Sequence, residues 1–239
     1  MERTRNWLRR PLAKTPYVYD ALMSARHDRR DQQTQPDTAI TIEGYPRCGN
    51  TYSVAAFRTS NSGERRVASH LHAPAHVKRA VRMGVPLIVL IREPAGTVLS
   101  QVIRRPKLTI RDALLDYISF YEATWPLRDE YVVGNFPLVT SDFGAVIDAV
   151  NERFKTCFNR YEHTPENEAA TFALVEELNR KESFGALVET KVARPSPVRE
   201  QLKKELATEL EESEILPVLR HAQAIYDSFI ACDSAVRGP

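Results

Sequence analysis

The chain has 239 residues, of which 43% are hydrophobic and 27% are charged, and its formal net charge is +2. This composition is ordinary for a globular protein, and it excludes a general affinity for nucleic acid. No apolar run approaches the roughly 20 residues that are needed to span a bilayer, so no transmembrane segment is expected. The length is sufficient for one α/β domain with a sizeable core.

The three cysteines are too few and too scattered for a disulfide framework, and the N-terminus lacks the apolar core of a signal peptide. Both features favour a reducing compartment, and we predict a cytoplasmic location.

Residues 1–37 are predicted to be a basic N-terminal extension, followed by one domain at residues 38–239. Residues 1–30 contain eight Lys or Arg and three acidic residues, a net charge of +5, and the polar run at residues 29–37 is typical of a linker. The extension is expected to form a short basic helix on the domain. A peripheral contact with an anionic membrane surface or substrate is the alternative.

The most informative stretch is residues 39–56, AITIEGYPRCGNTYSVAA, which predicts a strand, a tight loop and a helix. A loop of this kind directs several backbone N–H groups toward one point in front of a helix N-terminus, where a phosphate or sulfate fits. Arg47 adds a positive charge and Thr51 adds a hydroxyl group.

Two other interpretations of this loop are weaker. The nucleotide-triphosphate loop G-x-x-x-x-G-K-[ST] is matched at Gly44, Gly49 and Thr51, but Asn50 replaces its lysine, so an ATP or GTP site is disfavoured. Cys48 could be a phosphatase nucleophile, but position 54 is valine where such a loop closes with arginine. A kinase-like transferase and a degenerate nucleotide-binding module stay as alternatives.

A short strand at residues 66–70 is predicted next, and three of the six histidines lie at or just after its end. His72 should point the same way as His70 if the strand continues, and His76 is expected on the surface of a helix at about residues 75–83. The three histidines could instead bind zinc, but the segment contains no further ligand, so we predict no metal.

The apolar run at residues 86–91 predicts a central parallel strand that is buried on both faces. Arg92 follows its end, and Ser100 lies about two turns into a helix that begins near Pro94. Ligands of open α/β sheets bind outside the carboxyl ends of the strands, so Arg47 and Arg92 should face the same crevice. Alternatively, Arg92 pairs with an acidic side chain such as Glu93 or Asp142.

The remaining segments complete a three-layer α/β/α fold with a mainly parallel central sheet of the P-loop-like kind. A buried strand is predicted at residues 136–140, and Asp142 should cap a helix. Helices are predicted at the following positions: residues 109–131, 165–181, 197–211 and 214–233. The basic, proline-broken loop at residues 190–199 could bind an anion or simply be solvated.

Three motifs within residues 39–104 resemble those of the sulfotransferases. The sequence YPRCGNTY at residues 45–52 resembles the 5′-phosphosulfate loop, Y-P-K-S-G-T-T-W. Arg92 and Ser100 resemble the 3′-phosphate site, R-[ND]-P followed by V-x-S, and Ser69-His70-Leu71 resembles the T-H-L segment that holds the catalytic histidine.

This resemblance implies transfer of a sulfuryl group from 3′-phosphoadenosine 5′-phosphosulfate (PAPS) to a hydroxyl or amine of a small-molecule or carbohydrate acceptor. His70 would be the base, with His72 as the alternative, and Arg47 would stabilise the charge that develops on the leaving group. The residues implied in donor binding are Arg47, Cys48, Gly49, Asn50, Thr51, Tyr52, Arg92, Ser100 and Arg194.

Several positions depart from the family pattern. Arg47 replaces a lysine, and Tyr52 replaces a tryptophan but could still stack on adenine. Thr140 stands where the family often has a tyrosine near the adenine. Arg194 is assigned to donor binding although the usual R-K-G of the late loop is absent. The acceptor and the oligomeric state stay open.

Overall fold

Four parallel strands form the central sheet of the protein, in the spatial order β2-β1-β3-β4. Their bounds are Thr38–Gly44 (β1), Arg66–Ser69 (β2), Leu87–Ile91 (β3) and Val132–Asn135 (β4). All five residues of β3 are buried, because helices cover both faces of the sheet. The computed structural model describes residues 15, 31–61, 65–182, 189–190, 192 and 194–237.

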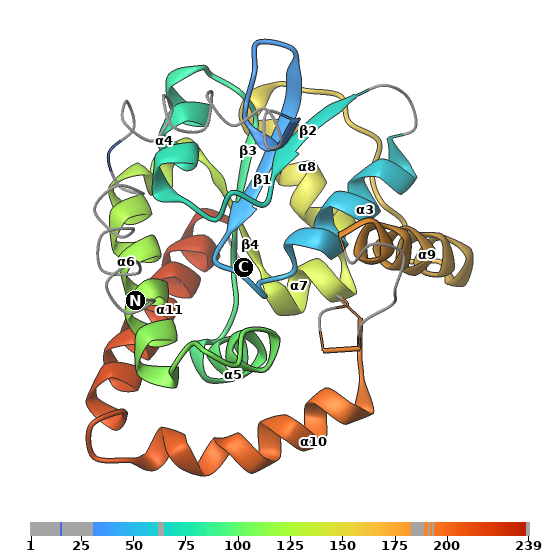
Figure 1. Ribbon diagram of the computed structural model, residues 1–239. Helices are drawn as coiled ribbons and strands as arrows, with labels where there is room; N and C mark the ends of the chain where they lie inside the picture. Colours follow the sequence, from blue (N-terminus) through green and yellow to red (C-terminus); the bar gives the residue numbers. More distant parts are fainter. Residues whose placement is uncertain are drawn as a thin grey trace.

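The helices form two outer layers and a group beyond the strand ends (Figure 1). One layer contains α4 (Pro74–Arg82), α6 (Ile110–Thr124) and α11 (Leu216–Arg237). The other contains α3 (Asn50–Ser60), α8 (Phe143–Phe154) and α9 (Pro165–Glu182). Beyond the carboxyl ends of the strands lie α5 (Pro94–Arg104), α7 (Phe136–Ser141) and α10 (Pro197–Leu206). Two 3-10 helices, Trp125–Glu130 and Ala207–Glu211, complete the described elements. The predicted three-layer α/β/α fold is confirmed.

Strands β1 and β3 approach so closely at their carboxyl ends that a side chain would not fit between them. Gly44 pairs with Leu90, and a Cβ atom at Gly44 would lie 2.6 Å from the Leu90 carbonyl oxygen. This close approach requires glycine at the start of the loop that follows β1.

The predicted strand at residues 136–140 is wrong. The strand comes earlier, at Val132–Asn135, and Phe136 begins helix α7. Pro137 lies in the first turn of this helix, where backbone N–H groups have no partner within the helix, so its missing N–H breaks no helical hydrogen bond. The helix predicted for residues 109–131 ends at Thr124 and continues as a 3-10 helix.

Part of the predicted linker packs against the domain. The side chain of Thr34 is fully buried, and its hydroxyl group lies 2.9 Å from that of Thr41 in β1. Arg79 of α4 also donates a hydrogen bond to the Thr34 carbonyl oxygen. Apart from Thr15, residues 1–30 of the predicted basic extension lie outside the described residues.

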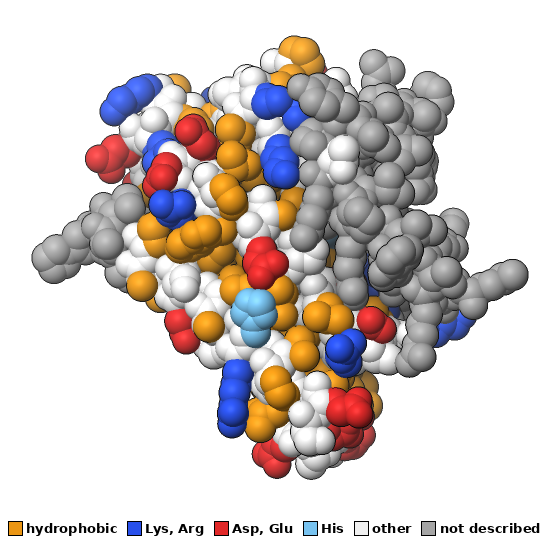
Figure 2. Space-filling view, turned by 90° about the vertical axis from the view of Figure 1, so that its left-hand side faces the viewer, with side chains coloured by type: hydrophobic (Ala, Val, Ile, Leu, Met, Phe, Trp, Pro, Cys, Tyr) orange, Lys and Arg blue, Asp and Glu red, His pale blue; other side chains and the backbone are white. Residues whose placement is uncertain are grey.

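The face formed by α6 and α11 shows small groups of hydrophobic side chains among charged ones (Figure 2). Among the described residues, Val198 is the one large hydrophobic side chain that is strongly exposed, at 55%. Within that same part of the chain, no helix has the length and apolar character that crossing a membrane requires.

Candidate functional site

The loop after β1 is curled by two residues in the left-handed region. Arg47 has a φ of 73° and Gly49 has a φ of 94°. Gly49 is the N-cap of α3 and makes no side-chain capping bond, so no capping side chain satisfies the first N–H groups of the helix. This is the backbone arrangement that binds an anion.

The side chains of Cys48 and Asn50 stabilise the loop through contacts within the protein. The Cys48 side chain is fully buried, with its sulfur 3.3 Å from the hydroxyl oxygen of Tyr121. Burial raises the pKa of the Cys48 thiol to about 11, so the thiol is protonated at neutral pH and is no phosphatase nucleophile. Asn50 donates from Nδ2 to the Tyr45 carbonyl oxygen at 3.1 Å, which closes the turn.

Tyr52 does not present its ring to a ligand. Its side chain is 6% exposed and packs on Phe172 of α9, with the ring centroids 5.8 Å apart. The expectation that Tyr52 stacks on adenine therefore conflicts with its place in the core between α3 and α9.

The two predicted cations lie next to each other. Arg47 donates from Nε to the Ser100 hydroxyl oxygen at 2.9 Å, and Arg92 Nη1 lies 3.4 Å from the Arg47 carbonyl oxygen. Arg92 also stacks on Phe136, with its guanidinium carbon 4.0 Å from the ring centroid. Phe136 was not predicted as a site residue, because residues 136–140 were predicted to form a strand.

Arg92 forms no ion pair with Glu93 or Asp142, the two acidic residues considered as its partners. Glu93 instead caps α5, accepting hydrogen bonds from the N–H groups of Ala95 at 2.6 Å and Gly96 at 3.0 Å. Asp142 caps α8 as predicted, and its carboxylate pairs with Arg160 at 2.7 Å.

His70 lies on a turn that begins where β2 ends. His70 Nε2 lies 3.1 Å from the Thr51 hydroxyl oxygen, and His70 Nδ1 lies 2.5 Å from the Ser69 hydroxyl oxygen. His72 Nδ1 lies 2.8 Å from the Gly44 carbonyl oxygen. The strand does not continue, so the two imidazoles do not point the same way: their planes are 80° apart and their centroids 5.9 Å apart.

His76 is buried, contrary to the prediction of a surface position. His76 Nδ1 lies 3.0 Å from Oε1 of Glu43, and His76 Nε2 accepts a hydrogen bond from the Thr34 N–H at 2.9 Å. Since both ring nitrogens are bonded within the protein, His76 cannot complete the zinc site considered with His70 and His72.

Two cations of the late basic segment differ in their surroundings: Arg194 is ion-paired, and Arg199 is buried. Arg194 pairs with Glu176 at 3.0 Å and with Glu189 at 2.5 Å, so its charge is already balanced. Arg199, in the first turn of α10, is 6% exposed. Burial lowers the pKa of Arg199, and the nearby positive charge of Arg92 adds a small contribution in the same direction.

Arg199 organises the loop before α10. Its guanidinium donates to the carbonyl oxygens of Glu189, at 3.1 Å, and of Val192 and Arg194. The sequence did contain a sign that Arg199 has a particular role. It is a cation in the first turn of a predicted helix, where the helix dipole disfavours positive charge.

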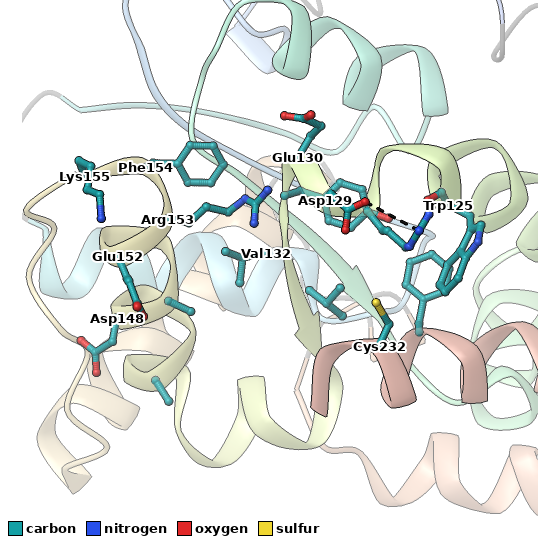
Figure 3. A pocket seen from close by; sticks show the side chains of 16 residues that line it. Trp125, Asp129, Glu130, Val132, Asp148, Glu152, Arg153, Phe154, Lys155 and Cys232 are labelled. Carbon is teal, nitrogen blue, oxygen red and sulfur yellow. Dashed lines mark hydrogen bonds and ion pairs between the residues drawn. The ribbon is translucent and has the colours of Figure 1, made fainter. Parts of the chain in front are cut away.

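A cavity of about 1010 Å³ lies at the opposite end of the sheet (Figure 3). Its lining includes the start of β4, the last residues of α8 and Phe229 and Cys232 of α11. Arg128 pairs with Asp129 across 3.8 Å at its rim. We call it the amino-end pocket. It contains no residue that the sequence predicted to be functional.

The residues that the structure brings together are a different group. We call them the carboxyl-end site: Arg47, Thr51, His70, Arg92 and Ser100. They come from the ends of three neighbouring strands and from helices α3 and α5. Two guanidinium groups, three hydroxyl or imidazole groups and an open helix N-terminus form a site that suits a ligand with several negative charges.

No protein-family model matches the chain, and no curated protein matches it. Among solved structures, the crystal structure of the mouse sulfotransferase SULT7A1 complexed with PAP is similar to it. The TM-score is 0.45 and the sequence identity is 14%, over 79% of this chain and 89% of that chain. A likeness this distant assigns no chemistry, so the carboxyl-end site is interpreted from its own residues.

Proposed function

We propose that this protein is a sulfotransferase that uses PAPS as its donor. The observation that carries the proposal is the contact between Arg47, Ser100 and Arg92: Arg47 Nε lies 2.9 Å from Ser100 Oγ, and Arg92 reaches the Arg47 carbonyl oxygen. These residues are far apart in the sequence and match the two phosphate motifs. A bis-phosphorylated nucleotide has two separate anionic groups, and it requires a cationic position for each within one site.

The residues present fit such a donor. The open N-terminus of α3, together with Arg47 and Thr51, would hold the phosphosulfate end. Arg92 and Ser100 would hold the 3′-phosphate, with Phe136 fixing the plane of the Arg92 guanidinium. When bound, the donor supplies an activated sulfuryl group whose leaving group is a phosphate.

The side chains of this chain would then position the acceptor and stabilise charge. His70 would take the proton from the acceptor hydroxyl or amine, since imidazole accepts protons near neutral pH. Ser69, 2.5 Å from His70 Nδ1, would orient the ring. The acceptor would replace the Thr51 hydroxyl, 3.1 Å away, as the partner of Nε2. Arg47 would stabilise the negative charge that develops on the leaving phosphate, in a position that is already prepared by its bond to Ser100.

The acceptor is proposed to be a small polar molecule, possible classes being carbohydrates and amines. Arg104 is the last residue of the helix that holds Ser100, and Arg105 and Lys107 follow it, so three positive charges lie close together in the sequence there. This charge favours an anionic or highly hydroxylated acceptor.

Calorimetry tests the donor site. 3′-Phosphoadenosine 5′-phosphate (PAP) should bind without metal, and ATP with magnesium should not. Tight binding of ATP with magnesium instead would favour a kinase-like transferase. Binding of PAP without turnover of radiolabelled PAPS on a broad acceptor panel would favour a degenerate nucleotide-binding module. Failure to bind PAP contradicts the proposal.

A further inference from the structure

Glu43 is the one charged residue of strand β1, and it lies next to the last residue of the strand. It lies on β1, between β2 and β3, and its side chain is fully buried. A carboxylate in such a place is costly unless several donors satisfy it. The proposed chemistry does not use Glu43, so its retention in the core needs another reason.

The donors that satisfy Glu43 belong to the turn that carries His70. Leu71 N–H donates to Glu43 Oε1 at 2.8 Å, and His72 N–H donates to Glu43 Oε2 at 3.0 Å. Each carboxylate oxygen therefore holds one of two successive peptide groups. His70 and His72, on either side of Leu71, have φ values of 65° and 50°. Non-glycine residues rarely adopt this conformation, and it persists only where the surroundings impose it.

The buried side chain of His76 forms a further contact with the Glu43 carboxylate. The Thr34 N–H donates to His76 Nε2, so this nitrogen carries no proton, and the neutral ring carries its proton on Nδ1. Nδ1 is directed at Glu43 Oε1, 3.0 Å away. Burial alone would raise the pKa of Glu43, but the hydrogen bonds from His76 and from the Leu71 N–H lower it, and the pKa lies below its usual value.

We infer that Glu43 is the positioning residue for His70. By holding the peptide groups that follow His70, the carboxylate sets where the imidazole lies relative to Thr51 and the loop at Arg47. The inference rests on the proposed function, in which His70 is the base. Thr34, His76 and Glu43 form a chain of buried contacts that ends at the turn, and none of them touches the ligand site directly.

Glu43→Gln is the sharpest variant, because it keeps the shape but offers one acceptor oxygen where two N–H groups need two. The kcat for sulfuryl transfer should fall about 10- to 100-fold, because a misplaced reacting group loses rate rather than affinity. The KM for PAPS and the Kd for PAP should stay within about threefold. The ¹⁵N and ¹H resonances of the His70 ring should shift.

Asp142→Asn is the matched control. Asp142 is also a carboxylate that accepts a backbone N–H, from Ala145 at 3.1 Å, but it serves helix α8. The control should leave kcat and the His70 resonances unchanged. An equal loss of kcat in Asp142→Asn, or an unchanged kcat in Glu43→Gln, overturns the inference.

A second variant decides the matter if Glu43→Gln does not fold. His76→Gln retains a donor for Glu43 but changes its position, and it should lower kcat about threefold or more without changing the Kd for PAP. An unchanged kcat would count against the inference. If the wild-type protein neither binds PAP nor turns over, the proposed function fails. The His70 resonances of Glu43→Gln, or of His76→Gln, then still show whether Glu43 positions the ring, and unchanged resonances reject it.

Discussion

The two ends of the central sheet differ in what they offer a ligand. The amino-end pocket is large, at about 1010 Å³, but its charged side chains are of mixed sign and partly paired, as with Arg128 and Asp129. In the carboxyl-end site, Arg47 contacts Ser100, Arg92 contacts the Arg47 carbonyl oxygen, and His70 contacts Thr51 of the helix that follows the Arg47 loop. Left-handed backbone occurs at both ends: at Arg47 and His70 near the carboxyl-end site, and at Lys155 in the lining of the amino-end pocket.

The two ends therefore differ in chemistry, and the proposed function is assigned to the carboxyl end on its polar groups rather than on volume. A ligand site is recognised by polar groups that converge on one point, and volume alone does not indicate them. The carboxyl end also follows the general rule for open α/β sheets, in which the strand ends and helix N-termini point at the ligand. The predictions below test whether the two ends differ in function.

The largest expected effect is at His70. His70→Ala should lower kcat about 10²- to 10⁴-fold, the usual range for loss of a general base, with the Kd for PAP nearly unchanged. His72→Ala should keep kcat within about tenfold. Steady-state kinetics with radiolabelled PAPS, together with calorimetry, measures both. A larger loss of kcat in His72→Ala than in His70→Ala would indicate that His72 is the base.

The next effect is on donor affinity. Arg47→Ala should weaken PAP binding about 10- to 100-fold, since hydrogen bonds to charged groups contribute about 1.5–3 kcal/mol. Arg153→Ala, in the amino-end pocket, should leave the Kd for PAP unchanged. Calorimetry of the two variants compares the ends of the sheet directly. Equal losses in both variants would remove the functional distinction between them.

A smaller effect concerns stability against acid. Because the pKa of Glu43 is lower in the folded protein than its usual value of 4.5, its contribution to stability is complete above about pH 4.5. That contribution is lost as the pH falls through the folded pKa. Urea unfolding at about pH 5 and about pH 3 should show a steeper loss of free energy in the wild type than in Glu43→Gln.

A control for this measurement is Glu152→Gln in the amino-end pocket, which should lose stability with falling pH as the wild type does. If Glu43→Gln and the wild type show the same pH dependence, Glu43 is not held as a carboxylate.

The smallest expected effect is chemical reactivity at Cys48. With a pKa of about 11, roughly one in several thousand Cys48 thiols is ionised at about pH 7.5, and the side chain is fully buried. Iodoacetamide should therefore label exposed Cys157, and Cys232 of the amino-end pocket, long before Cys48. Mass spectrometry of the labelled peptides measures the order. Rapid labelling of Cys48 would show that the loop opens.

Most strands and helices could be predicted from the sequence because their signals are local. The apolar run that ends before Arg92 predicted β3, and the glycines around Arg47 predicted the loop before α3. The strand predicted at residues 136–140 failed because an apolar run with a proline fits either a strand end or a helix start. The partner that decided between them, β3, is about 45 residues away in the sequence.

Side-chain burial was less predictable than the elements that carry the side chains. Tyr52 was expected at the ligand and His76 at the surface, but both are buried. Their surroundings come from distant segments: Phe172 of α9 covers Tyr52, and Thr34 and Glu43 enclose His76. The one local signal for this buried network was Glu43 itself, a charged residue within a predicted strand.

The amino-acid sequence by itself determined the α/β class, the loop at Arg47 and the placement of Arg92 after a buried strand, because short-range periodicity and turn residues encode them. Tertiary structure alone decided which of these side chains meet. The pairing of Arg47 with Ser100, the turn at His70 and its support by Glu43 depend on strand order and on the close approach of β1 and β3. Such contacts join residues that are distant in the chain, and no local pattern specifies them.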